Sequence, residues 1–246
     1  MAVASSTKQI SDDLAGQGYS LVRGAEMRAA LTSTAYEAEL AAEWDRLGPD
    51  NYLKDNARFR ERRYGRFLYS PRAKSFRLLA HQPYFQSETA NRYAGGIHRV
   101  VEPVTEAAVK NPLMRELVEF DFDHFPVEDE RLDHPWLVAC HQFRIIARPE
   151  EIGEPTPEGV HRDEIDFGAI HLMSRTNADG GISSVYDNDE RLTAQFQLQG
   201  PMDTMFWADR KVLHSVSPIT VVDPSAPAVR DILILGYTCS PGFEEQ

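Results

Sequence analysis

The feature that most constrains the fold is a succession of short, apolar, β-type runs in the second half of the chain. From residue 137 on, these runs alternate with turn signals such as Asp179-Gly180-Gly181 and Gly200-Pro201. Strands this short and closely spaced are typical of a sandwich or barrel and not of alternating βαβ units. The expected strands cover residues 138–147, 167–173, 182–186, 194–198, 204–207, 212–216 and 232–238.

The first half is richer in helix signals. Residues 14–22 predict a short strand, and the Ala-, Leu- and Glu-rich stretch 26–47 predicts a helix that ends at Gly48-Pro49. Asn111-Pro112 has the pattern of an N-cap followed by proline in the first helical turn. The aromatic and arginine-rich stretch 59–69 predicts a strand on the flank of the sheet.

These patterns predict an α+β, mainly β fold: a β-sandwich or jelly roll with helices packed on one outer face. The helical half is too thin to hold a core of its own. We therefore expect a single domain over residues 1–246, with a helix-rich part over about 1–135 and a jelly-roll core over about 136–240.

Charge and composition exclude several classes of protein. Asp and Glu number 38 against 26 Lys and Arg, and this formal net charge of −12 argues against a broad nucleic-acid-binding face or adhesion to anionic lipid. The N-terminal stretch lacks a signal-peptide core, and no apolar run is long enough to span a membrane. Two cysteines are too few for a disulfide scaffold. We expect a cytoplasmic protein.

The segment Gly159-Val160-His161-Arg162-Asp163 carries the clearest chemical signal. On an extended backbone, residues i and i+2 point the same way, so His161 and Asp163 offer an imidazole nitrogen and a carboxylate side by side. Alone, this pair is a weak signal and more often represents a histidine that is hydrogen-bonded to a nearby carboxylate. His214, in the apolar run 212–216, adds a second histidine. Two histidines and one carboxylate form the facial triad of non-haem Fe(II) oxygenases.

Arg230 stands at the entrance of the apolar run 232–238. A guanidinium at the start of a buried strand needs a carboxylate, and its planar fork suits bidentate binding. The distal carboxylate of 2-oxoglutarate would fit, and so would an ordinary ion pair with Asp231 or Asp223.

The chain resembles the 2-oxoglutarate/Fe(II) dioxygenases related to bacterial L-isoleucine 4-hydroxylase. The resemblance rests on His161-Arg162-Asp163, His214-Ser215-Val216-Ser217-Pro218 and Arg230-Asp231. Upstream it includes Arg62-Arg63-Tyr64-Gly65, Gln86-Ser87 with Asn91 and Gly95-Gly96, and His141-Gln142-Phe143-Arg144, so it runs from about residue 18 to 238.

The resemblance implies a double-stranded β-helix in which His161, Asp163 and His214 bind Fe(II) and Arg230 holds 2-oxoglutarate. It also implies a hydroxylase that uses O₂ and releases succinate and CO₂. The expected substrate is a small molecule, a free or N-acylated aliphatic amino acid, or a sulfur-containing one that is converted to a sulfoxide.

Further contacts are expected from the local patterns. If 59–69 is a strand, Arg63 shares a face with Phe67 and can meet a substrate carboxylate, and Tyr64 lies in the same stretch. Gln142 and Arg144 alternate with His141 and Phe143, so one of the two pairs faces the site; we assign Gln142 and Arg144 to cosubstrate or substrate binding. Asp166 contacts a substrate amine or caps a turn, and we expect His171 in the core.

Two other functions remain open at this point. A cupin-like metal-dependent dioxygenase or isomerase would use the metal without 2-oxoglutarate and would leave Arg230 pointing outward. A non-catalytic jelly-roll regulatory or binding protein would not need the intact triad. The helix over 26–47 either covers the sheet or serves a homodimer interface.

Overall fold

The computed structural model describes residues 4–89 and 91–243. Within these ranges, the α-helices span Ile10–Gly16 (α1), Gly24–Ala30 (α2), Glu37–Ala41 (α3), Glu106–Lys110 (α4) and Pro112–Asp123 (α5). Short 3-10 segments span Thr7–Gln9, Thr34–Tyr36, Ala42–Arg46, Lys54–Asn56 and Asp129–Asp133. The strands span Tyr19–Val22 (β1), Gly48–Pro49 (β2), Arg60–Ser70 (β3), Ser75–Leu78 (β4), Trp136–Ala147 (β5), Phe167–Thr176 (β6), Ala178–Gly180 (β7), Ile182–Tyr186 (β8), Leu192–Gln197 (β9), Thr204–Ala208 (β10), Leu213–Val216 (β11), Ile219–Val221 (β12) and Ala228–Cys239 (β13).

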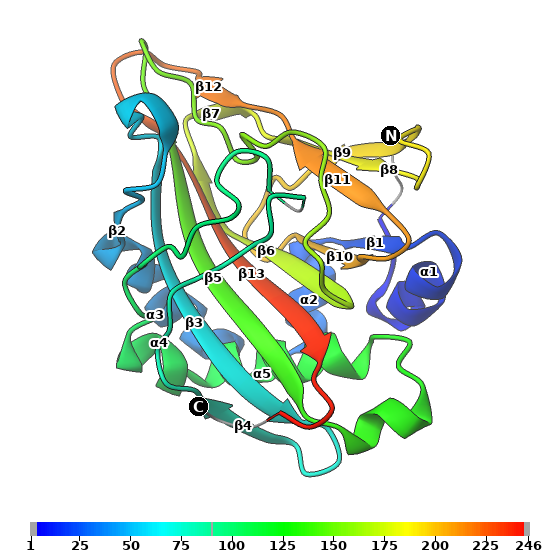
Figure 1. Ribbon diagram of the computed structural model, residues 1–246. Helices are drawn as coiled ribbons and strands as arrows, with labels where there is room; N and C mark the ends of the chain where they lie inside the picture. Colours follow the sequence, from blue (N-terminus) through cyan, green and yellow to red (C-terminus); the bar gives the residue numbers. More distant parts are fainter. Residues whose placement is uncertain (1–3, 90, 244–246) are drawn as a thin grey trace.

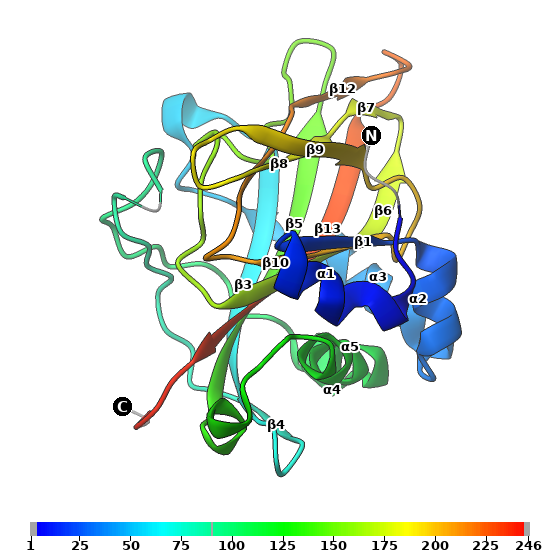
Figure 2. The same ribbon diagram turned by 90° about the vertical axis from the view of Figure 1, so that its right-hand side faces the viewer.

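A large antiparallel sheet forms the centre of the molecule. In the described part of the chain it has eight strands in the order β1-β10-β6-β13-β5-β3-β2, with β4 paired to β3. A three-stranded sheet (β11-β8-β9) and the pair β12-β7 lie across one side of it, and the helices gather along the other (Figures 1 and 2). This mainly β, double-stranded β-helix architecture with helices on one face confirms the expected fold class.

Two apolar layers hold the sheets and helices together. On the helix side, Leu113 and Leu117 of α5 pack with Val138 and Cys140 of β5. On the other side, Val185 and Phe196 of the small sheet belong to a second cluster with Ile170, Leu172 and Trp207. The large sheet is therefore buried on both faces, and the parity of a residue in a strand decides which layer it enters.

The helix expected over residues 26–47 is broken into α2, α3 and two 3-10 segments. The break follows Ala30, where the backbone N–H groups of Thr32 and Ser33 donate to the carboxylate of Glu116 on α5. Leu40 and Trp44 of this segment are buried in the helix-side core, and the indole of Trp44 donates to the carbonyl of Phe143 on β5. The segment covers the sheet, one of the two roles expected for it.

Other local expectations have mixed outcomes. The Asn111 side chain accepts a hydrogen bond from the N–H of Leu113, so the predicted N-cap of α5 is confirmed. The strand expected over 14–22 forms only from Tyr19, because α1 continues to Gly16. The strands β7 and β12 were not expected from the sequence, since each has only three residues. No helix of the described residues is long and apolar enough to cross a membrane.

Candidate active site

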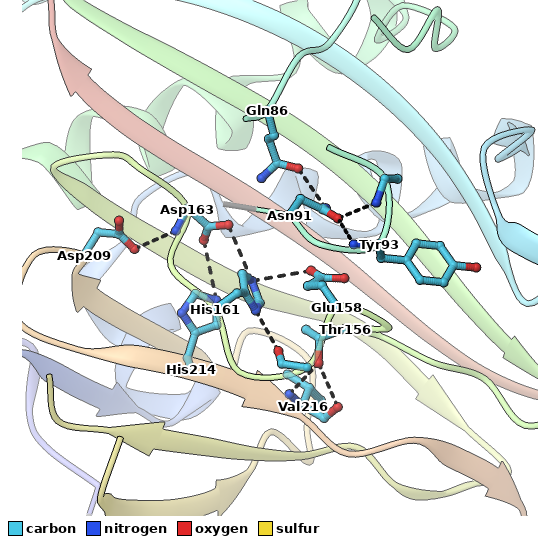
Figure 3. A network of polar contacts seen from close by, with 12 residues as sticks. Gln86, Asn91, Tyr93, Thr156, Glu158, His161, Asp163, Asp209, His214 and Val216 are labelled. Atoms are coloured by element: carbon cyan, nitrogen blue, oxygen red, sulfur yellow. Dashed lines mark hydrogen bonds and ion pairs between the residues drawn. The ribbon is translucent and has the colours of Figure 1, made fainter. Parts of the chain in front are cut away.

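Three metal-ligating side chains meet at the edge of the small sheet. His214 lies on β11, and His161 is joined to it by a pair of backbone hydrogen bonds of 3.1 and 3.0 Å. Asp163 follows, with Oδ1 3.6 Å from His161 Nε2 and Oδ2 3.5 Å from His214 Nε2. One ligand atom from each residue lies within 4.8 Å of the others. Figure 3 shows the three side chains pointing toward one another.

Neighbouring groups fix the orientation of this triad. His161 Nδ1 lies 2.9 Å from the carbonyl oxygen of Gly159; because a carbonyl only accepts, Nδ1 carries the proton and Nε2 faces the triad. The backbone N–H groups of Asp163 and Ile165 both donate to the buried carboxylate of Asp209. The turn that presents the Asp163 carboxylate is therefore held by a second carboxylate behind it.

The charges of the triad are strongly coupled. Burial opposes protonation of His161, but the hydrogen bond to Asp163 and the charges of Asp163 and Glu158 prevail and raise the pKa of His161 to about 9. Burial and the charge of His161 lower the pKa of His214 to about 4. Burial would raise the pKa of Asp163, yet its hydrogen bond with His161 and the charges of both histidines lower it. Without a metal, the cluster near neutral pH therefore holds an ionised Asp163, a neutral His214 and a protonated His161, so that binding of a divalent metal displaces the proton from His161 Nε2.

A cavity of about 340 Å³ opens beside the triad, between the large sheet and the small one. Every second side chain of β3, β5 and β13 points away from the helices, and these side chains form the floor of the cavity. A loop between β4 and α4 forms part of its wall. Besides the triad, its lining includes Arg60, Arg62, Tyr64, Tyr84, Gln86, Arg99, His141, Phe143, Ile145, Glu158, Ile170, Arg230, Ile232 and Ile234.

Arg230 enters this cavity without an ionic partner. Its side chain is fully buried, and none of its three guanidinium nitrogens has a hydrogen-bond partner among the described residues. The adjacent Asp231 points to the other face of the sheet, where Arg144 and Ser174 bind it. A buried guanidinium in this state is costly unless a ligand supplies the acceptor atoms.

A second cationic group forms another part of the wall. Arg60 and Arg62 share the buried carboxylate of Asp50, at 2.8 and 3.4 Å, and Arg99 donates to the neutral amide oxygen of Gln86, at 2.7 Å. Among the residues that the structure describes, these three guanidinium groups thus have one carboxylate within ion-pair distance. The arginine run 58–66 was a visible signal for this group, but nothing in the sequence indicated that Arg99 would join it.

Aromatic rings connect the cationic group to the triad. The guanidinium groups of Arg62 and Arg99 lie over the ring of Tyr84, at 5.3 and 4.6 Å from its centre, and Arg62 Nη2 lies 3.0 Å from Nδ1 of His141. Burial raises the pKa of Tyr84, and the negative charge of Asp163 is the next cause of this increase. The carboxylate of the triad therefore interacts with a ring on the opposite wall of the cavity. Both cationic regions therefore belong to the space that adjoins the triad.

A sequence profile described as 2OG-Fe dioxygenase matches residues 41–236. The chain belongs to this family. L-isoleucine-4-hydroxylase of Bacillus thuringiensis is 29% identical over 191 residues, covering 76% of this chain and 78% of the relative. 3(1)-hydroxy-L-isoleucine 4-dioxygenase of Pantoea ananatis is 26% identical over 157 residues, 63% of each protein. A solved bsmA homologue from Methylobium petroleophilum PM1 superposes with a TM-score of 0.88 at 27% identity, covering 100% of this chain and 98% of that one.

As a 2OG-Fe dioxygenase, the protein is a non-haem oxygenase that uses Fe(II), 2-oxoglutarate and O₂. The residues present fit these groups. Two imidazoles and a carboxylate are the donor set that suits Fe(II), and the unpartnered guanidinium of Arg230 suits the distal carboxylate of 2-oxoglutarate. This membership decides against the cupin-like and non-catalytic alternatives.

Three expected contacts of this 2OG-Fe dioxygenase, one on β3 and two on β5, lie on the face of a strand that points away from the cavity. Arg63 does share a face with Phe67, but that face packs against the helices, and Arg63 binds the carbonyls of Arg46 and Pro103 instead of entering the cavity. Its neighbours Arg62 and Tyr64 line the cavity. The alternation along the strand was correctly anticipated, but the face that adjoins the cavity was not.

The same error affects β5. Gln142 and Arg144 point to the helix side, where Arg144 binds Asp231, while His141 and Phe143 line the cavity. The expected cosubstrate contacts of Gln142 and Arg144 are therefore wrong, because the cavity adjoins the other pair.

Two further polar residues lie away from the cavity. Asp166 binds Arg131 at 2.8 Å and accepts a hydrogen bond from the N–H of Cys239. Its carboxylate therefore connects the start of β6 to the end of β13 and does not face the cavity. His171 is fully buried on the helix side against Asp121 and Thr204, which is the core position expected for it.

Proposed function

We propose that this enzyme hydroxylates an aliphatic carbon of a small amino-acid-like substrate. The observation that carries this proposal is a second cationic group in the same cavity as the triad and Arg230: among the described residues, Arg60, Arg62 and Arg99 have one carboxylate, that of Asp50, within ion-pair distance. One cationic region suffices for the distal carboxylate of the cosubstrate. A second one supports binding of another carboxylate, that of the substrate.

His161, Asp163 and His214 would hold the iron, and Gly159 and Asp209 would keep the ligand atoms aimed at it. When bound, the iron supplies activation of O₂, with 2-oxoglutarate converted to succinate and CO₂ and one oxygen atom inserted into a substrate C–H bond. The chain's own contribution is to bind and orient the two organic molecules. Arg230 would bind the distal carboxylate of 2-oxoglutarate through its free N–H groups.

At the substrate end, Arg62 and Arg99 would bind the carboxylate, and Asp50 and Gln86 hold these guanidinium groups in place. Aliphatic side chains such as Ile170 line the same cavity and suit an aliphatic substrate body. A thioether in that position would be oxidised to a sulfoxide by the same chemistry.

Glu158 favours a free amino group over an acylated one. Its carboxylate lies 3.5 Å from His161 Nε2 and lines the cavity. Burial lowers the pKa of Arg99, and the charge of Glu158 is among those that oppose this lowering, so the two groups interact. A substrate with its carboxylate at Arg99 could direct its ammonium group to Glu158.

The large sheet takes strands from both halves of the chain, since β3 pairs with β5. This pairing supports a single catalytic domain over the chain, with the helix-rich part contributing the cavity wall.

The test is an anaerobic titration of the protein with Fe(II) and then 2-oxoglutarate, followed by the weak visible charge-transfer band of the chelate. We expect the band with the wild type and a sharp loss of it in Arg230→Ala. Aliphatic and sulfur-containing amino acids, free and N-acetylated, are then screened for succinate release and for a product heavier by one oxygen. Fe(II) binding without the band would contradict the proposed cosubstrate site. A band without turnover of any amino acid would contradict the proposed substrate class.

A further inference from the structure

Arg230 lines the cavity, and a second arginine lies beside it on the neighbouring strand, just outside the cavity lining. Arg175 on β6 is the direct cross-strand partner of Arg230 on β13. Like charges in this arrangement destabilise a sheet unless something lies between them to neutralise them. Burial, and then the charge of Arg175, lower the pKa of Arg230 to about 10, so the two cations repel one another.

A β-bulge brings Arg175 to this face. Between Asp231 and Ile232 the pairing of β13 with β6 shifts by one residue, so Ile232 faces Leu172 whereas Asp231 faces Ser174. Simple alternation from Leu172 would direct Arg175 to the helix side. The extra residue reverses the parity, which is what bulges next to binding sites commonly do.

The contacts of Arg175 leave its charge uncompensated. Its Nη2 donates to the carbonyl oxygens of Ala178 and Gly180, both at 2.8 Å, while its Nη1 is buried without a hydrogen-bond partner. In the described part of the chain, neither Arg175 nor Arg230 forms an ion pair with a carboxylate. The nearest acid on this segment, Asp179, is exposed and affects the pKa of Arg175 only as a minor influence beside burial.

Gly181 lies close to the side chains of both arginines. A methyl group on this residue would lie 2.9 Å from Arg175 Nη1 and 3.4 Å from Arg230 Cδ. Its φ of +64° also disfavours any other residue there. Gly181 therefore adds no side chain of its own between the two arginines, and the methyl group would also lie 3.1 Å from Ile219 Cγ2.

We propose that Arg175 is a positioning residue for 2-oxoglutarate: together with Arg230 it forms a two-arginine well that the distal carboxylate of the cosubstrate neutralises. The inference rests on the proposed role of Arg230. It adds that the free protein holds an unfavourable pair of like charges at this corner and that the cosubstrate relieves it. Binding of 2-oxoglutarate thus also stabilises the segment between β6 and β8, which contains Gly181.

The charge-neutral variant Arg175→Gln separates this role from a purely structural one. In Mn(II)-loaded protein we expect calorimetry to show roughly 10- to 100-fold weaker 2-oxoglutarate binding, the range for loss of one charge-assisted contact. The melting temperature without 2-oxoglutarate should be unchanged or higher, because one of two repelling charges is gone, and the increase caused by 2-oxoglutarate should shrink. In steady-state assays the KM for 2-oxoglutarate should rise while the KM for the second substrate stays unchanged.

Two further variants serve as controls. Arg191→Gln removes an exposed arginine that pairs with Asp189, and it should change none of these quantities. Arg175→Lys keeps the charge without the planar fork of donors, and it should bind 2-oxoglutarate more tightly than Arg175→Gln does. If the glutamine variant does not fold, the lysine variant decides: retained affinity with a lower melting temperature supports the charge role, and a tenfold loss contradicts it.

The outcomes distinguish this inference from the proposed function. If Arg230→Met loses 2-oxoglutarate binding but Arg175→Gln binds it as the wild type does, the two-arginine well is wrong and the Arg230 site stands. A lower melting temperature with an unchanged 2-oxoglutarate-induced shift would also overturn it and make Arg175 a support of the turn. If the wild type itself does not bind 2-oxoglutarate, both proposals fall together.

Discussion

Two neighbouring charged residues of β13, one on each face of the large sheet, differ in whether the chain provides them with a partner. On the helix side, Asp231 accepts two hydrogen bonds from Arg144 and one from Ser174. On the cavity side, Arg230 is one residue away along the same strand, and its guanidinium has no partner among the described residues. Both side chains are buried, so solvent does not account for the difference.

The contrast separates structural from functional charge. A buried ion pair that only supports the fold needs its hydrogen bonds satisfied within the chain, because each unsatisfied group lowers the free energy of unfolding. Buried cations left open in a cavity that also holds a metal triad are instead ready for a ligand. The cavity-side residues should therefore govern binding and turnover, and the helix-side residues should govern stability.

The largest effect is expected from two histidines, one in the triad beside the cavity and one on the helix side of the large sheet. His214→Ala removes a metal ligand and should lower Fe(II) affinity and turnover by more than about 100-fold. This loss is larger than that typical for a residue that only hydrogen-bonds to a metal ligand. His171→Gln, on the helix side, should lower the free energy of unfolding by about 2–4 kcal/mol because it leaves Asp121 buried with a weaker partner. Metal titration and denaturant unfolding of both variants check this. Normal Fe(II) binding by folded His214→Ala would contradict the triad.

The neighbours Arg230 and Asp231 sharpen the comparison within one strand. Arg230→Met should weaken 2-oxoglutarate binding about 100-fold without lowering the free energy of unfolding, because an unpaired buried charge is removed. Asp231→Asn should lower the free energy of unfolding by about 1.5–3 kcal/mol and leave 2-oxoglutarate binding intact. This range is reduced for solvent screening, because Arg144 is partly exposed. Calorimetry and chemical unfolding on the same samples give both quantities. A reversal of the two patterns would refute the division of roles.

The substrate end gives a smaller effect. Arg99→Gln should raise the KM for the amino acid roughly 10- to 100-fold and leave the KM for 2-oxoglutarate unchanged, since it removes one charge-assisted contact to the substrate carboxylate. Glu158→Gln should weaken the preference for a free amino group, measured as the ratio of kcat/KM for the free and N-acetylated forms. An unchanged ratio would remove Glu158 from the substrate site.

The smallest effect is expected at Arg63. Because its contacts are with backbone carbonyls and Glu102 on the helix side of β3, Arg63→Gln should change both KM values by less than about twofold and cost about 1 kcal/mol of stability. Steady-state kinetics and thermal unfolding check this. A large rise in either KM would mean that Arg63 acts in the cavity after all.

Much of the site could be anticipated because its signals are local. The spacing of His161 and Asp163 and the apolar run around His214 indicated a metal triad, and the position of Arg230 before an apolar run indicated a buried cation in need of an anion. Arg99 gave no such signal, because it lies in the loop before α4 and reaches the cavity only through the path of that loop. Arg175 also escaped, since the bulge that redirects it leaves no mark in the hydrophobic pattern.

The sequence by itself determined which residues share a face. Arg63 with Phe67, and Gln142 with Arg144, were grouped correctly because side chains alternate along any extended strand. Only the tertiary structure decided which face meets the cavity, since both faces of this sheet are buried and hydrophobicity alone does not tell the helix layer from the small sheet. The two-residue period of a strand identifies which residues share a face, whereas the layer packed against that face determines whether it serves the core or the cavity.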